Sequence, residues 1–280
     1  MIPSPEPESE PKVPPITPGF AVLLTFVVAF SQVFCILMLG SLGFGMGPAS
    51  LGIATILAFG FSFRLAVPRI PTPPSVHLGF VRPAPMAWWA ALFLLSSVLL
   101  TSEVDNIAKE IWPLPDKLLS VEPPEGVAHQ LGLALVLVVV LPAAQEILFR
   151  GLLQPAMVRL WGSGRGIAFI SGLNALAFGL LNPWAFAPTF TSSLVLGILR
   201  QSSSSLLPSL LLHALFGGAT LLATHEFFRI PGFDDTSAPH TPMEWLGTAA
   251  LLCGIGLGLC RAAATPRGPT LPTELPGQDP

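Results

Sequence analysis

The sequence predicts an all-α fold, a polytopic membrane bundle of about eight transmembrane helices, because it contains repeated apolar runs of bilayer length. The chain of 280 residues is 51% hydrophobic and only 10% charged. Its mean hydropathy is +0.69, and a soluble domain has roughly 25% charged residues. An integral membrane protein is therefore expected, with the lipid bilayer as its surroundings.

Four apolar runs of about 20 residues come first, and each is long enough to cross a bilayer. They cover residues 19–42, 48–67, 85–101 and 129–148. Four less regular segments follow, at residues 166–181, 184–199, 206–224 and 243–260. The middle two of these are short or broken by Pro and Ser. Interrupted spans usually line a cavity enclosed by protein, because lipid cannot satisfy their backbone polar groups.

The charged residues support this division, because Lys and Arg concentrate in cytoplasmic loops close to span ends. Acidic residues fill the alternate connections, 103–125 and 226–244. Both termini are then predicted to be cytoplasmic, in a membrane of the bacterial cytoplasmic type. The arginines predicted to lie on the cytoplasmic side are Arg64, Arg69, Arg82, Arg150, Arg159, Arg165, Arg200, Arg261 and Arg267.

The formal net charge of −3 provides no basic field, so nucleic acid is not an expected partner. The three cysteines lie inside apolar segments and are interpreted as small buried hydrophobes. No internal repeat supports a transporter built from inverted repeats. The N-terminus lacks the positive region of a signal peptide.

Outside the spans, residues 1–17 and 262–280 are predicted to be disordered tails, which leaves 18–261 as the transmembrane helical domain. Residues 104–111 are predicted to form a short surface helix in the loop after the third span, cut off by Pro113 and Pro115. A second surface helix, 152–160, is expected along the membrane interface, after a turn at the sequence QEILFRG.

The sequence QEILFRG, residues 145–151, sets an acid and a base inside a hydrophobic run. Glu146 and Arg150 are four residues apart, so on a helix they point the same way and can pair. An ionisable pair at membrane depth is energetically costly, so a functional role is its default interpretation. A structural ion pair that fixes the fourth span against its neighbours is the alternative.

Two further positions complete a candidate site. Asn182 ends the sequence FGLLN, with Asn174 two turns earlier on roughly the same helical face, and His213 lies in the middle of the seventh span. A carboxylate and an imidazole held in a membrane cavity could position and deprotonate water for hydrolysis of a peptide bond. The alternatives are a hydrogen-bonded packing role for His213 and a turn at Asn182, which precedes Pro183.

No cofactor is expected at this site. A zinc ion would need at least three protein ligands of the His, Asp, Glu or Cys type. Here only Glu146 and His213 are of that type, beside weaker amide ligands, and the sequence contains no HExxH. A metal bound by these two residues is the alternative left open.

Residues 76–224 resemble the CPBP family, the membrane proteins that include the CAAX prenyl endopeptidases and bacteriocin-processing or immunity proteins. The sequence QEILFRGLLQ is similar to the family's E-E-x-x-x-R motif with its Phe-Arg-Gly continuation. SGLNALAFGLLN resembles the F-x-x-x-H helix, with Phe178 in the first position. LGILRQSSSSLLPSLLLHALFG is similar to the segment that ends in H-x-x-x-N, and LGFVRP to an entry segment before the third span. The resemblance implies intramembrane endopeptidase activity, metal-dependent or not, on a membrane peptide or a prenylated or helical protein segment.

Three central positions depart from the family pattern. The first Glu of the paired motif, which the resemblance makes the water-activating base, is Gln145 here, an amide that cannot usefully accept a proton. The family's His falls on Asn182 and its Asn on Gly217. Only His213 is kept, with Glu146 and Arg150 beside it. Loss of a general base alone typically costs about 10² to 10⁴ in rate.

Two functions follow from this pattern. In the one we favour, the protein is a catalytically degenerate member that keeps the cavity and binds a membrane peptide, prenylated tail or partner helix. In the other, it is an active endopeptidase in which Glu146 is the base, His213 stabilises the oxyanion and Asn182 orients water. Glu146 is rotated by about 100° from Gln145 on an α-helix, so the second function requires local unwinding.

Overall fold

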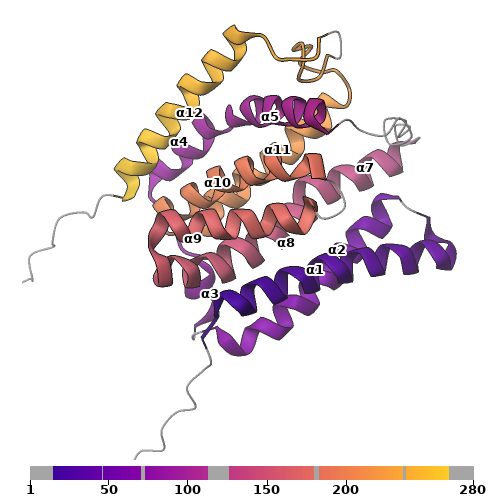
Figure 1. The fold of residues 1–280 in the computed structure, drawn as a ribbon, viewed down its shortest axis with the longest axis vertical. Helices are drawn as coiled ribbons and strands as arrows, with labels where there is room; N and C mark the ends of the chain where they lie inside the picture. The colour runs from indigo at the N-terminus through magenta and orange to yellow at the C-terminus, as the bar shows by residue number, and fades with distance from the viewer. Residues whose placement is uncertain are drawn as a thin grey trace, which may run out of the picture.

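The computed structural model describes residues 15–45, 47–70, 73–112, 126–179, 183–235 and 238–264. Within these ranges every regular element is a helix, and the only β-type pairing is an isolated bridge between Pro231 and Asp235. The prediction of an all-α membrane bundle is therefore confirmed (Figure 1).

In the described part of the chain, six helical stretches are long and apolar enough to cross a membrane. One of them, Val127–Gly179, contains the fourth predicted segment and most of the fifth. A further helix, α10, coincides with the sixth predicted segment but is interrupted by polar residues and is not one of the six. The elements are α1 (Pro18–Leu39), η1 (Gly40–Phe44), α2 (Pro48–Ala66), η2 (Val67–Arg69), α3 (Pro74–Leu78), α4 (Pro85–Leu94), α5 (Ser97–Ile111), α7 (Val127–Leu135), η3 (Val136–Val140), α8 (Leu141–Gln145), η4 (Glu146–Leu153), α9 (Gln154–Gly179), η5 (Pro183–Ala185), α10 (Phe186–Ser203), α11 (Leu206–Ala223) and α12 (Met243–Ala264).

The chain reverses direction inside α9, at Gly162. This residue has φ 78° and ψ 167°, a conformation that is essentially restricted to glycine. A Cβ on Gly166 would lie 2.6 Å from the backbone nitrogen of Val158, so the two arms of the bend pack closely. Among the described residues six stretches qualify as candidate spans, compared with the eight that were predicted.

The turn expected at QEILFRG is absent. The helix continues through Glu146–Leu153 as a wider π-helical turn and runs on into α9. Leu152, Leu153 and Met157 are buried in the core, because the face they share packs against α1 and α3. The prediction of an interfacial helix over 152–160 was therefore wrong for most of its length, and only its last two residues, Arg159 and Leu160, are exposed.

The predicted surface helix 104–111 is likewise not a separate element. It is the second half of α5, which follows α4 after a break of two residues, Leu95 and Ser96. The hydroxyl of Ser96 donates to the backbone oxygens of Phe93 and of Ala249 in α12, at 2.7 and 3.0 Å. This contact bends the helix without ending it. Residues 113–125, with the two prolines, lie outside the described residues.

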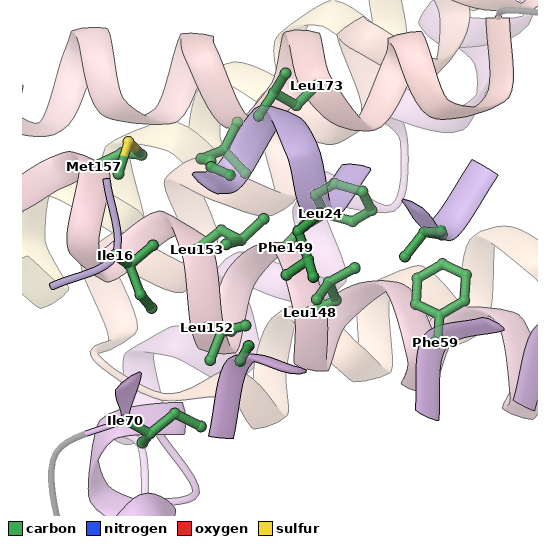
Figure 2. Packing of buried hydrophobic residues seen from close by; sticks show 14 of the residues in the cluster. Ile16, Leu24, Phe59, Ile70, Leu148, Phe149, Leu152, Leu153, Met157 and Leu173 are labelled. Atoms are coloured by element: carbon green, nitrogen blue, oxygen red, sulfur yellow. The ribbon is translucent and has the colours of Figure 1, made fainter. Parts of the chain in front are cut away.

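Two hydrophobic clusters divide the bundle. The first joins α1 and α2 with η4 and α9 and is centred on Leu148, Phe149 and Leu153 (Figure 2). It also contains Ile16, from the segment predicted as a tail; residues 1–14 and 265–280 of the predicted tails lie outside the described residues. The second cluster joins α4, α10, α11 and α12. Because η4 contributes its apolar face to the first cluster, its polar residues face the second half.

The two acidic connections lie together at one end of the bundle. Glu103 of α5 contacts His240 at 2.7 Å and accepts a hydrogen bond from the backbone of Thr241. Asn106 donates to the backbone oxygen of Gly232 at 2.7 Å. These contacts agree with the expectation that both connections lie on the same side of the membrane.

Candidate functional site

Glu146 and Arg150 lie on successive turns of η4 and are both fully buried, with 0% exposed surface. An Nη1 atom of Arg150 lies 3.5 Å from Oε1 of Glu146. The pairing predicted from their spacing of four residues is therefore present, although the helix is locally wider than an α-helix. Leu148 and Phe149, between them in sequence, point into the first hydrophobic cluster and so fix the orientation of the polar face.

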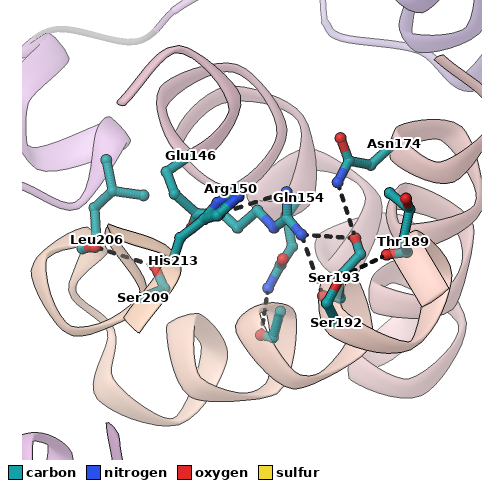
Figure 3. Close-up of polar contacts among 11 residues, drawn as sticks. Glu146, Arg150, Gln154, Asn174, Thr189, Ser192, Ser193, Leu206, Ser209 and His213 are labelled. Atoms are coloured by element: carbon teal, nitrogen blue, oxygen red, sulfur yellow. Dashed lines mark hydrogen bonds and ion pairs between the residues drawn. The ribbon is translucent and has the colours of Figure 1, made fainter. Parts of the chain in front are cut away.

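His213 reaches the same carboxylate from α11. Its Nδ1 lies 2.9 Å from Oε1 of Glu146, across 67 positions of sequence (Figure 3). The carboxylate is 0% exposed while the histidine side chain is 18% exposed. The site can therefore be reached at the imidazole, whereas the acid behind it is enclosed.

Arg150 is held on its other side by α10. Its Nη2 atom donates to Oγ of Ser193 at 2.6 Å and to the backbone oxygen of the same residue at 3.3 Å. Asn174 of α9 also donates to the Ser193 hydroxyl, at 3.4 Å. Ser193 thus connects the guanidinium of Arg150 to two further helices, α9 and α10, as Figure 3 shows.

The second polar link to α10 comes one turn later. Gln154 donates to the backbone oxygen of Gly197 at 2.9 Å. A Cβ on Gly197 would lie 2.7 Å from a methyl carbon of Ile167, so the glycine permits this close approach. Sequence analysis missed both Ser193 and Gln154. The available signal was a row of small and polar residues in an apolar helix, which in membranes usually marks a helix interface.

Gln145 ends α8 and is buried, with 8% of its surface exposed. The expectation that Glu146 would point away from the site unless the helix unwinds is resolved by the π-helical turn, which begins at Glu146. π-helical turns of this kind occur frequently at functional sites. Position 145 carries an amide, so Glu146 is the acid that contacts His213.

Gly217 lies against the backbone of η3. A Cβ at this position would be 2.1 Å from the carbonyl oxygen of Leu137 and 2.9 Å from its carbon. Backbone cannot retreat as a flexible side chain can. The position that the CPBP resemblance reserves for Asn is therefore closed to any side chain in this packing of α11.

The remaining candidate positions are less informative. Phe178 is partly buried and packs against the first hydrophobic cluster. Asn182 lies outside the described residues. Among the buried polar atoms of the described part of the chain, Oε2 of Glu146 and Oδ1 of Asn174 have no hydrogen-bond partner.

Within the described ranges, no three His, Cys, Asp or Glu side chains come together in a way that could hold a metal ion. The candidate site offers one carboxylate and one imidazole, and zinc sites use at least three protein ligands. These residues do not fit a zinc centre.

Comparison with known families supplies the decisive observation. Residues 127–219 match the family model described as "Rce1-like: Type II CAAX prenyl endopeptidase Rce1-like". These residues form an Rce1-like domain of the CAAX protease family. No curated protein and no solved structure matches the chain.

The Rce1-like domain contains the whole candidate site. It runs from the start of α7 into α11, and so includes the paired motif at 145–150, His213 and Gly217. Ser193 and Gln154, which the structure adds, are also inside it. The family match and the apolar helices together make the chain a CAAX-protease-like membrane protein.

Proposed function

We propose that this protein is a catalytically degenerate member of the CAAX protease family that binds a membrane peptide, a prenylated protein tail or a partner helix. The observation that carries the proposal is the state of the site's acid. Glu146 is 0% exposed and is shared by Arg150 and His213. A carboxylate held in this way is a structural anchor, because a general base must reach the water that it deprotonates.

The packing of Gly217 supports the same function. Restoration of an Asn at this position would place its Cβ 2.1 Å from the carbonyl oxygen of Leu137. The α11–η3 contact has thus closed the space in which a polar side chain would stabilise a developing oxyanion. Under this proposal the amide at Gln145 leaves the site without the family's base, and Gly217 leaves it without an oxyanion donor. Arg150, His213 and the helical frame remain.

Active proteolysis is the second candidate, and one observation favours it. The Glu146 and His213 contact of 2.9 Å brings an acid and an imidazole together, and Oε2 of Glu146 has no hydrogen-bond partner. In this function Glu146 activates water, His213 stabilises the oxyanion and Asn182 orients the water. Burial of the carboxylate opposes it, since the Glu146 side chain is 0% exposed and only the His213 side chain of the pair has exposed surface.

We further propose that the end of the bundle that carries the arginines faces the cytoplasm, with residues 18–261 as the transmembrane domain and 76–224 as its family-like core. The argument is the preference of Lys and Arg for cytoplasmic loops. The acidic cluster of Glu103 and His240 then lies on the opposite side.

The first prediction separates binding from catalysis. A fluorescent S-farnesyl peptide that ends in Cys-Val-Ile-Ala should bind the purified protein in phosphatidylcholine nanodiscs and remain uncleaved, as judged by anisotropy and mass spectrometry. His213→Leu should weaken binding by about tenfold, equivalent to about 1.4 kcal/mol. His225→Leu, which alters an exposed histidine at the end of α11, is the matched control and should bind normally.

Cleavage by the wild type that disappears in Glu146→Gln would contradict the proposed function and establish the active enzyme. In the double variant Gln145→Glu with Asn182→His, slow turnover would be consistent with the proposal, because the base is restored while position 217 stays closed. The peptide's failure to bind at all would reject the binding function itself.

A further inference from the structure

An apolar cavity of about 420 Å³ lies between α4, α5, α11 and α12, and the connection before α12 forms one of its walls. None of the lining residues that the structure describes is charged. A cavity with such a lining does not hold water. Leu92 of α4 and Phe228 of the connection line it and are exposed, so the cavity is accessible to the hydrocarbon chains of a surrounding bilayer.

A second pocket, of about 400 Å³, adjoins this cavity, and the two share Val98 and Phe233. On α5 the second pocket extends beyond the cavity as far as Lys109, and on α11 as far as Ala223. Both directions lead toward the end of the bundle that carries the acidic connections. The cavity and the second pocket therefore form one elongated site, whose inner part is apolar and whose outer part lies near that end.

The second pocket, unlike the cavity, has polar and charged walls. Thr101, Asp105 and Lys109 line it at intervals of four residues, so they share one face of α5. Asp105 and Lys109 form a partly exposed salt bridge at 2.5 Å. Oγ1 of Thr101 is buried and has no hydrogen-bond partner in the described part of the chain. Trp184 also lines the pocket, and Trp side chains favour the level of the lipid head groups.

The charges of the second pocket select a ligand that carries both signs. Lys109 can bind a phosphate and Asp105 can bind a cation. A partly exposed salt bridge contributes little stability, so its two members can each take an opposite charge of a ligand at small cost. Glu103 and Glu110 of the same helix add negative charge, which disfavours a ligand with a net negative charge. A zwitterionic head group meets these conditions.

The carboxylate of Asp105 distinguishes between the two common zwitterionic phospholipids. The primary ammonium of phosphatidylethanolamine has N–H groups that donate to a carboxylate, as a lysine ammonium does. The trimethylammonium of phosphatidylcholine has none. Hydrogen bonds between charged groups are shorter and roughly twice as strong as those between neutral groups. Asp105 should therefore favour the ethanolamine head group.

We infer that the elongated site binds one molecule of phosphatidylethanolamine, with an acyl chain in the apolar cavity and the head group in the second pocket. The ammonium lies at Asp105, the phosphate at Lys109 and an ester oxygen at Thr101, in the order in which these residues follow Val98 along α5. The lipid site shares no residue with the candidate functional site. It therefore does not depend on the proposed peptide-binding function.

The test is a competition among phosphatidylethanolamine, phosphatidylcholine and phosphatidylglycerol with identical acyl chains. The full chain in detergent receives equal amounts of the three, and native mass spectrometry measures the bound lipid. Wild type should bind phosphatidylethanolamine about tenfold more tightly than either competitor, equivalent to about 1.4 kcal/mol. Asp105→Asn should bind phosphatidylethanolamine and phosphatidylcholine equally. Arg165→Gln, the control, changes an exposed charge in the bend of α9 and should keep the preference.

A second variant tests the apolar cavity while it leaves the charged pocket intact. Ala219→Leu places a larger side chain in the cavity and displaces about two CH₂ groups of the acyl chain. It should weaken the binding of phosphatidylethanolamine by about tenfold. Thermal unfolding in detergent without added lipid shows whether each variant is folded. If Asp105→Asn does not fold, Ala219→Leu still decides whether the lipid lies in this site.

Equal binding of phosphatidylethanolamine and phosphatidylcholine by the wild type would overturn the inference. Tighter binding of phosphatidylglycerol would also overturn it, because that lipid has a net negative charge and no ammonium. A preference that survives in folded Asp105→Asn would show that the ammonium lies elsewhere. Undiminished binding by folded Ala219→Leu would show that the acyl chain does not enter the cavity.

Discussion

Two neighbouring serine hydroxyls in α10 form different hydrogen bonds. The Ser193 hydroxyl stands where three helices meet, since it accepts from Arg150 at 2.6 Å and from Asn174 at 3.4 Å. Its neighbour Ser192 has the same side chain, but its hydroxyl donates to the Thr189 oxygen of its own helix, at 3.1 Å. Adjacent serines in one helix therefore have different consequences for stability.

The second prediction uses this pair. Ser193→Ala removes an acceptor from a buried guanidinium and should lower the free energy of unfolding by about 1–2 kcal/mol, the range for hydrogen bonds to charged groups and between membrane helices. Ser192→Ala should change it by only a few tenths of a kcal/mol, because the bond lies within one helix. Thermal unfolding in detergent measures both. Equal effects of the two substitutions would show that Ser193 does not fasten Arg150.

At the scale of elements, the sequence predicted most of the helices but not their irregularities. Apolar runs located α1, α2, α4, α11 and α12, because hydropathy and length suffice for a span. The π-helical turn at Glu146–Leu153 could not be predicted, since QEILFRG contains no proline and its single glycine, Gly151, does not by itself indicate a widened turn. The bend between α4 and α5 likewise depends on a contact of Ser96 with α12.

The same distinction applies to the site. Glu146 and Arg150 were predictable because their spacing alone makes them neighbours on a helix. The candidate site included His213, but the sequence could not decide whether it contacts Glu146, because the two residues are 67 positions apart on different helices. Ser193 was found by neither route, because the row of small and polar residues in α10 indicates a helix interface but not which of its serines contacts Arg150.

The contact of α11 with η3 yields a further prediction. Gly217 and Gly218 are neighbours in α11, but a Cβ at 217 would meet the Leu137 carbonyl at 2.1 Å, whereas nothing lies within 4 Å of a Cβ at 218. Gly217→Ala should destabilise the protein by roughly 1–3 kcal/mol, as overpacking does. Gly218→Ala should be neutral or stabilising by up to about 1 kcal/mol, because Ala favours helix.

Unfolding of both variants in the same detergent gives the comparison. A Gly217→Ala protein as stable as Gly218→Ala would mean that α11 can move away from η3. Position 217 would then be open to an Asn side chain, and the steric argument for a degenerate site would fail.

At the scale of the whole molecule, the connection before α12 is fastened to α5 by a titratable contact. His240 lies between two carboxylates, with Nδ1 at 2.7 Å from Glu103 and Nε2 at 3.0 Å from Glu110. Both ring nitrogens can donate only when the imidazole carries both protons. The hydrogen bond to Glu103, and after it the one to Glu110, therefore raises the pKa of His240 above its ordinary 6.5.

The last prediction follows from the sign of this pKa shift. A pKa that is higher in the folded than in the unfolded protein gives stability that is complete below about pH 6.5 and is lost as the pH rises through the folded value. The thermal midpoint of the wild type should therefore fall between pH 6 and pH 8.5 by more than that of His240→Ala. The matched control, His225→Ala, should keep the full pH dependence. Equal slopes for wild type and His240→Ala would show that the connection docks on α5 through Asn106 and Thr241 alone, whose hydrogen bonds to Gly232 and Glu103 need no protonated imidazole.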